Sequence, residues 1–171
     1  ADLAALLFAS KGEAKIESLE SDKEFCVGMF RDGLWEQRRT AIGVVRQLKH
    51  AVEIPYLKVK GEASFELTLP KFPINIYKAM VRFFRIVMAK MNGAEVAVQI
   101  WWNKSEEKYE ITVPVQVVSG ASVRFTHDNE RQSDSNLIWA MDVHSHNTMG
   151  AFFSGGDNAD EKSTRLFGVL G

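Results

Sequence analysis

Four side chains in one short segment have the types and the spacing of a metal site. The segment VHSHNTMGAFFSGGD, residues 143–157, holds His144 and His146 two positions apart and Ser154 three positions before Asp157. If a strand continues through the histidines, its alternation places both imidazoles on one face, close enough to bind one metal ion. A catalytic zinc ion usually has three protein ligands and a water. The sequence therefore indicates a zinc site with Asp157 as the third ligand.

Ser154 has two interpretations. A serine that begins a helix could stabilise a developing oxyanion together with the backbone amides at the positive helix end. Ser154 and Asp157 also match the capping box that starts many ordinary helices, and two histidines at this spacing are weak evidence of a metal on their own. The combination favours the metal site, because the serine and aspartate directly follow two histidines on a buried strand.

Predicted helices and strands before and after this segment should hold it in position. The apolar run Ile74–Met91, ended by Asn92 and Gly93, predicts a helix with a left-handed stop. Apolar and β-branched residues predict strands, and the two long runs after the helix should form a hairpin. The strand segments are 65–69, 94–102, 109–125, 137–143 and 165–171. The polar segment 126–136 predicts a loop, and a helix is predicted from Ser154 to about residue 164.

The first fifty residues give a different pattern. Apolar residues recur at helix-like spacing in segments 3–10 and 34–50, and the segment EFCVGMF between them, residues 24–30, predicts a short strand. Strands on both sides of a long helix predict a mixed α/β or α+β fold, with a sheet flanked by helices.

The composition limits the classes of binding partner that are expected. The formal net charge of −1 gives no electrostatic basis for binding nucleic acid or anionic lipid, so neither is an expected partner. The apolar runs are shorter than the roughly 20 residues of a membrane helix. Cys26 is the only cysteine, which rules out an intramolecular disulfide and favours a reducing cytoplasm. Any transition metal must then be held by histidine and carboxylate.

The segment resembles a known motif. HSH, seven residues, then SGGD is similar to the JAMM motif H-x-H-x7-S-x-x-D of the JAB/MPN zinc metalloproteases, with His144, His146, Ser154 and Asp157 at its four positions. The resemblance extends from about residue 65 to 171 in the order of elements. It implies a cytidine-deaminase-like JAB/MPN sheet over residues 61–171, of the prokaryotic JAB-domain type, preceded by an N-terminal α/β extension over residues 1–60.

The resemblance also implies a catalytic glutamate. The family carries this residue on the strand after its first long helix, where it acts as general acid and base toward the attacking water. The matching position here is Glu95, and a carboxylate in an apolar strand is costly to bury unless it has a partner or a nearby cation. The alternative for Glu95 is a strand-end residue at a solvated turn. Glu66 is the reserve candidate, although it alternates outward from Phe65 and Leu67.

The implied activity is hydrolysis of an isopeptide or peptide bond at the C-terminus of a ubiquitin-like or sulphur-carrier protein. Zinc would be held by His144, His146 and Asp157, with Ser154 stabilising the oxyanion. Two alternatives stay open: a non-catalytic MPN-type protein-binding scaffold, and a metal-dependent hydrolase of small amides. The family usually continues beyond the position of Gly171, so the domain would be truncated or completed by residues 1–60. No oligomeric state is indicated.

Overall fold

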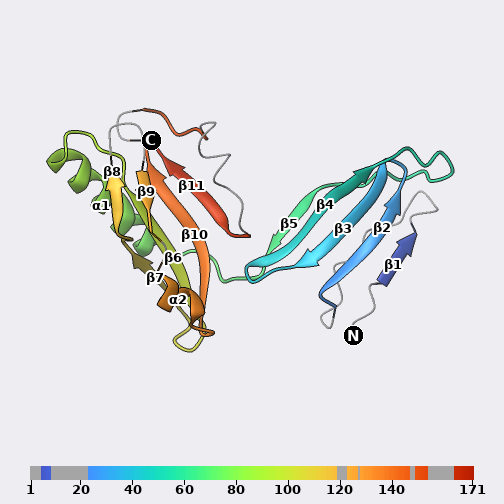
Figure 1. The fold of residues 1–171 in the computed structure, drawn as a ribbon, viewed down its shortest axis with the longest axis horizontal. Coiled ribbons are helices and arrows are strands. Elements are labelled where there is room, and N and C mark those ends of the chain that lie inside the picture. The colour runs from blue at the N-terminus through green and yellow to red at the C-terminus, as the bar shows by residue number, and fades with distance from the viewer. Residues whose placement is uncertain (1–4, 9–22, 119–122, 127, 147–148, 154–163) are drawn as a thin grey trace. The chain divides into compact units, whose positions relative to one another are not determined.

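The chain forms two compact units, residues 1–70 and 71–171. The computed structural model describes residues 5–8, 23–118, 123–126, 128–146, 149–153 and 164–171 (Figure 1). The boundary follows Pro70, ten residues after the position expected from the sequence, residue 60. The described residues combine helices with sheets, so the fold class is α+β.

The first unit is a five-stranded sheet. Its strands are β1 (Ala5–Phe8), β2 (Phe25–Phe30), β3 (Gly33–Arg39), β4 (Gly43–Ala51) and β5 (Ser64–Leu67). They pair in sequence order, β1 with β2 in parallel and the others antiparallel. The strand predicted around residues 65–69 thus belongs to this unit as β5.

The helical expectation for segments 3–10 and 34–50 is wrong, because the described parts of both are strands. For segment 34–50, two tight turns explain the difference. Directly after the turn from β2, Gly33 at the start of β3 has a φ of 141°, and a Cβ atom there would lie 2.1 Å from the carbonyl oxygen of His50. Between β3 and β4, the Thr40 hydroxyl donates to the carbonyl of Gly43 at 2.7 Å and accepts from its amide at 3.1 Å. A chain that reverses at both points pairs as antiparallel strands. The strand predicted over 24–30 is confirmed as β2.

In its described residues, the second unit contains a four-stranded sheet, a separate hairpin and two helices. In chain order its elements are α1 (Ile74–Lys90), β6 (Ala97–Asn103), β7 (Lys108–Thr112), β8 (Gln116–Val118), β9 (Val123–Phe125), α2 (Asn129–Ser133), β10 (Leu137–Ser145) and β11 (Leu166–Leu170). The sheet order is β11-β10-β6-β7, and among the elements that the structure describes β8 pairs with β9 alone. Strand β11 runs parallel to β10, while the other neighbours are antiparallel.

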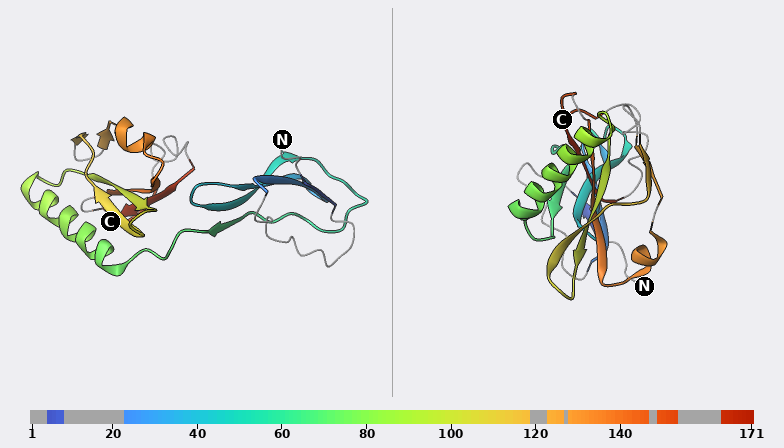
Figure 2. Two further views of the ribbon diagram at one scale, coloured as in Figure 1. Left: turned by 90° about the horizontal axis from the view of Figure 1, so that it is seen from below. Right: turned by 90° about the vertical axis from the view of Figure 1, so that its left-hand side faces the viewer.

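The two helices lie against opposite faces of this sheet (Figure 2). Helix α1 buries Met80 and Phe84, and Phe84 lines a small hollow together with Ser145 of β10. On the other face, Arg131 of α2 lies 5.3 Å from the ring of Trp101. Along β10, His144 and Asp142 point to the opposite side from Ser145. They therefore lie on the sheet face against which α2 packs.

Most predicted elements of this unit are present, with shifted bounds. The helix over 74–91 is confirmed as α1, and Asn92 and Gly93 have positive φ angles as predicted for its stop. The hairpin of two long strands is confirmed as β6 and β7. The segment 109–125 is not one strand, since it divides into β7, β8 and β9, and the loop predicted at 126–136 contains α2, capped by the Asp128 side chain. The predicted helix from Ser154 lies outside the described residues.

Among the residues that the structure describes, no helix combines the length and the apolar character needed to cross a membrane.

Candidate functional site

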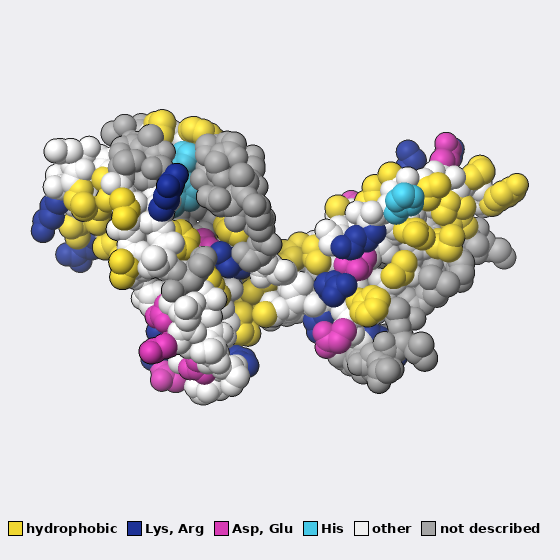
Figure 3. Space-filling model, viewed as in Figure 1, with side chains coloured by type: hydrophobic (Ala, Val, Ile, Leu, Met, Phe, Trp, Pro, Cys, Tyr) yellow, Lys and Arg dark blue, Asp and Glu magenta, His cyan; other side chains and the backbone are white. Residues whose placement is uncertain are grey.

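The two histidines lie together at the end of β10. His144 is the penultimate residue of the strand, and His146 follows its last residue. Their ring centroids are 5.0 Å apart, with the planes inclined at 50°. The His146 amide donates to the carbonyl of Leu170 at 2.8 Å, so β11 still supports the chain there. The alternation of β10 thus brings both imidazoles to one place, and Figure 3 shows histidine side chains (cyan) reaching the surface of the second unit.

The surroundings of the two rings differ. His146 is buried and His144 is half-buried, and the ring of Phe152 packs edge-on against His146 at a centroid distance of 4.7 Å. Nε2 of His144 and Nδ1 of His146 are buried and form no hydrogen bond with the described residues, although both side chains have other interactions. A neutral imidazole nitrogen is a common zinc ligand. Two such rings on one strand end suit a metal chemically.

Glu95 lies on the neighbouring strand segment, at the same end. In the antiparallel register Ala97 is opposite His144. The pairing continues beyond β6, because the Ser145 amide donates to the Val96 carbonyl at 3.0 Å and the Val96 amide donates to the Ser145 hydroxyl at 3.1 Å. The next position places Glu95 opposite His146, on the histidine face. Its side chain is only 4% exposed, so this carboxylate is well removed from bulk solvent.

The other candidates lie elsewhere or are not described. Glu66 is exposed on β5 of the first unit, where it pairs with Val44. Ser154 and Asp157 lie outside the described residues. Within the described ranges, no three His, Cys, Asp or Glu side chains come close enough to hold a metal ion together. The structure therefore brings together three of the six candidate residues, and Glu95 does not complete a set of three ligands with the histidines.

A polar cluster lies on the same sheet face as the two histidines, farther from the end of β10. Asp142, two residues before His144, accepts a hydrogen bond from Trp139 Nε1 at 2.9 Å and a second from Arg165. The Arg165 guanidinium lies 3.6 Å from the Trp139 ring centroid. Opposite Asp142 on β6 is Gln99, a fully buried side chain whose Nε2 makes no hydrogen bond with the described part of the chain. Sequence patterns do not single out this cluster, because Arg165 and Gln99 are far from Asp142 along the chain.

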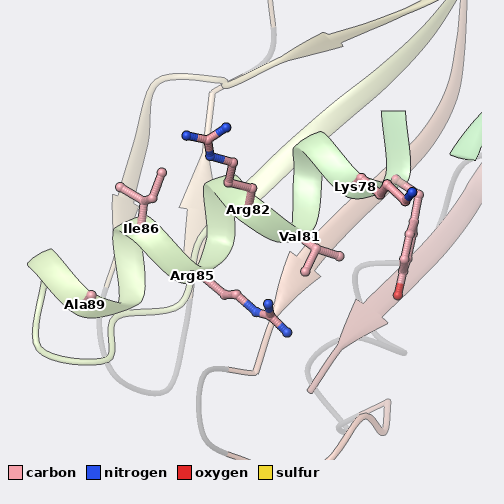
Figure 4. Close-up of a pocket in the computed structure, with 7 residues that line it drawn as sticks. Lys78, Val81, Arg82, Arg85, Ile86 and Ala89 are labelled. Atoms are coloured by element: carbon pink, nitrogen blue, oxygen red, sulfur yellow. The ribbon is translucent and has the colours of Figure 1, made fainter. Parts of the chain in front are cut away.

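A second hollow, of about 550 Å³, lies along α1 (Figure 4). Three of its lining residues are basic and the rest are apolar or aromatic. The lining residues are Tyr77, Lys78, Val81, Arg82, Arg85, Ile86 and Ala89. The lining has neither a carboxylate nor a histidine, and histidine is the side chain that most often serves in general acid and base catalysis. The end of β10 is the better candidate site.

Comparison of the chain with protein-family models and with curated proteins finds no match. What the site can do therefore follows from the chemistry of its own side chains.

Proposed function

We propose that the second unit is a zinc-dependent hydrolase of the JAMM (JAB/MPN) type, which cleaves an isopeptide or peptide bond at the C-terminus of a ubiquitin-like or sulphur-carrier protein. One observation carries the proposal. The two histidines of the H-x-H motif lie 5.0 Å apart, beside a buried glutamate on the same face of the β6–β10 pair. Two imidazole ligands and a general base are part of what zinc-assisted hydrolysis requires, and Asp157 is the third zinc ligand in this proposal.

Each residue has a distinct role in this proposal. His144 and His146 hold the ion with their imidazole nitrogens, and Asp157, placed by the motif spacing, is the third ligand. When bound, zinc would supply a Lewis acid that lowers the pKa of its bound water to about 7. Glu95 accepts the proton of the attacking water and returns it to the leaving amine. Ser154 donates to the oxyanion, a contribution of about 3 kcal/mol for a donor of this kind.

Zinc content tests the metal site directly. Purified protein should contain about one zinc ion per chain, measured by elemental analysis after loosely bound metal is removed. His146→Ala should lose the ion, because it removes one imidazole from the pair. His50→Ala is the matched control, since His50 is exposed on β4 of the first unit and should not affect zinc.

Glu95→Gln separates metal binding from catalysis. This variant should retain zinc and lose hydrolysis of a ubiquitin-like fusion, because the amide cannot accept the proton. Retained turnover in Glu95→Gln would assign the base to another residue. A wild-type protein that takes up no zinc when zinc is offered would refute the enzymatic proposal and leave the protein-binding scaffold.

A further inference from the structure

The backbone ladder between β6 and β7 stops beside the candidate site. Pairing runs from Asn103 with Lys108 to Gln99 with Thr112. The same register would next place Ala97 of β6 opposite Pro114. Proline has no backbone N–H and cannot donate to a ladder. The edge of β6 at Ala97 therefore needs another partner.

The side chain of Gln116 fills that place. The Ala97 amide donates to Gln116 Oε1 at 2.8 Å, and Gln116 Nε2 donates to the Ala97 carbonyl at 3.1 Å. Gln116 Nε2 also lies 3.3 Å from the Pro114 carbonyl oxygen, to which it donates. One side-chain amide thus makes the two bonds that a paired strand residue would make. Ala97 is 2% exposed, so its amide and carbonyl would otherwise be buried unpaired, at a cost in stability.

The clamped residue lies directly beside the proposed ligands. Val96 and Ser145 exchange hydrogen bonds across β6 and β10, so the next pair, Ala97 and His144, is of the non-hydrogen-bonded kind. In such a pair the backbone polar groups point away from the partner strand and the side chains come close. The amide and carbonyl of Ala97 accordingly point to Gln116, while its methyl group faces the side of His144. Glu95 follows two residues away on the same face.

We propose that Gln116 is a positioning residue, which fixes the beginning of β6 so that His144 and Glu95 are held in place, and which couples the β8–β9 hairpin to the candidate site. Gln116 is the first residue of β8, so a movement of the hairpin would move the clamp. The effect on catalysis rests on the proposed function, whereas the effect on Ala97 and His144 does not.

The test compares Gln116→Ala with Thr126→Val. The control removes another hydrogen bond at the base of the hairpin, from the Thr126 hydroxyl to the Val115 carbonyl at 3.3 Å, and leaves the clamp intact. In Gln116→Ala, NMR should show exchange of the Ala97 amide faster by about tenfold, together with a shift of the His144 ring resonances. In the zinc-loaded enzyme, kcat should fall about tenfold and its pH profile should shift, with KM and zinc content unchanged. Thr126→Val should show none of these changes.

Several results would overturn the proposal. Unchanged exchange at Ala97 would show that the clamp does not exist in solution. Faster exchange at Ala97 with unaltered His144 resonances, or with unaltered kcat in an active enzyme, would show a clamp that positions nothing.

Should Gln116→Ala fail to fold, a second variant tests the clamp. Gln116→Glu keeps the acceptor for the Ala97 amide and loses the donor to its carbonyl, so the exchange rate of the Ala97 amide should lie between the rates of the wild type and the alanine variant. Wild-type exchange at Ala97 in that variant would overturn the proposal too. A wild type without zinc or turnover, but with the expected responses at Ala97 and His144, would refute the proposed function alone.

Discussion

Replacing Arg165 by methionine should destabilise the second unit much more than removing an exposed ion pair of the same unit. Arg165 Nε donates to Asp142 Oδ2, and the two side chains are only 13% and 10% exposed. The Arg165 guanidinium also stacks on the ring of Trp139. Methionine keeps the stem of the side chain but leaves the Asp142 carboxylate without its cation in a nearly buried position.

The magnitude follows from the burial of the pair. Removing one partner of a buried ion pair costs about 3 to 5 kcal/mol, and the slight exposure of Arg165 and Asp142 places the expected loss near the lower end, at about 3 kcal/mol. The matched control is Lys108→Met, because Lys108 pairs with Glu106 while both side chains are more than half exposed, at 56% and 54%. Exposed pairs contribute up to about 1 kcal/mol. The two variants should therefore differ by about 2 kcal/mol.

Urea denaturation followed by tryptophan fluorescence measures this difference. A Trp35→Phe background leaves all remaining tryptophans in the second unit, so that the signal reports that unit alone. The free energies of unfolding of the two variants are compared on the condition that both depend on urea concentration with the same slope. The reasoning is refuted if Arg165→Met costs no more than Lys108→Met.

Two further predictions concern the sheet of the second unit. Ala97→Leu should reduce zinc content and lower stability by about 1 to 3 kcal/mol, because the larger side chain crowds His144, whereas Ala89→Leu on the exposed face of α1 should change neither quantity. The hydrogen bond from Asn103, at 2.9 Å, is the main cause that lowers the pKa of Glu110 below its usual 4.5. A lowered folded-state pKa adds stability above the unfolded value and loses it as the pH falls below about 4.5. Acid titration of Glu110→Gln should show a smaller loss over that range, and an identical loss would contradict the assignment.

Local sequence patterns correctly predict those elements in which all the signals along the segment favour the same structure. Helix α1 has a long apolar run and a stop at Asn92 and Gly93, both of which adopt positive φ. The expectation for residues 34–50 failed because apolar spacing there also suits a helix, and the turn that decides the structure depends on the Thr40 side chain bonding to Gly43.

In the candidate site, too, some features follow from the sequence and others do not. The spacing of His144 and His146 is sufficient to place both on one strand face, and the structure locates both there. Glu95 is buried, which fits its apolar neighbours and not the alternative of a residue at a solvated turn. The role of Gln116 had no sequence signal, because its partner is the backbone of a residue 19 positions away, and backbone groups leave no trace in the pattern of side chains.

The parallel pairing of β10 and β11 has a consequence for the affinity of the proposed site. Parallel neighbours require a crossover connection, and the chain between His146 and Arg165 provides it, with Asp157 inside. Both ends of that connection are anchored to the same sheet. In the proposed site this connection would present Asp157 to the histidines at an effective concentration on the order of millimolar, so the third ligand would not incur the entropy loss of bringing in a separate molecule. Because effective concentration falls as a linker lengthens, lengthening this connection should weaken metal binding even when all the ligands are kept.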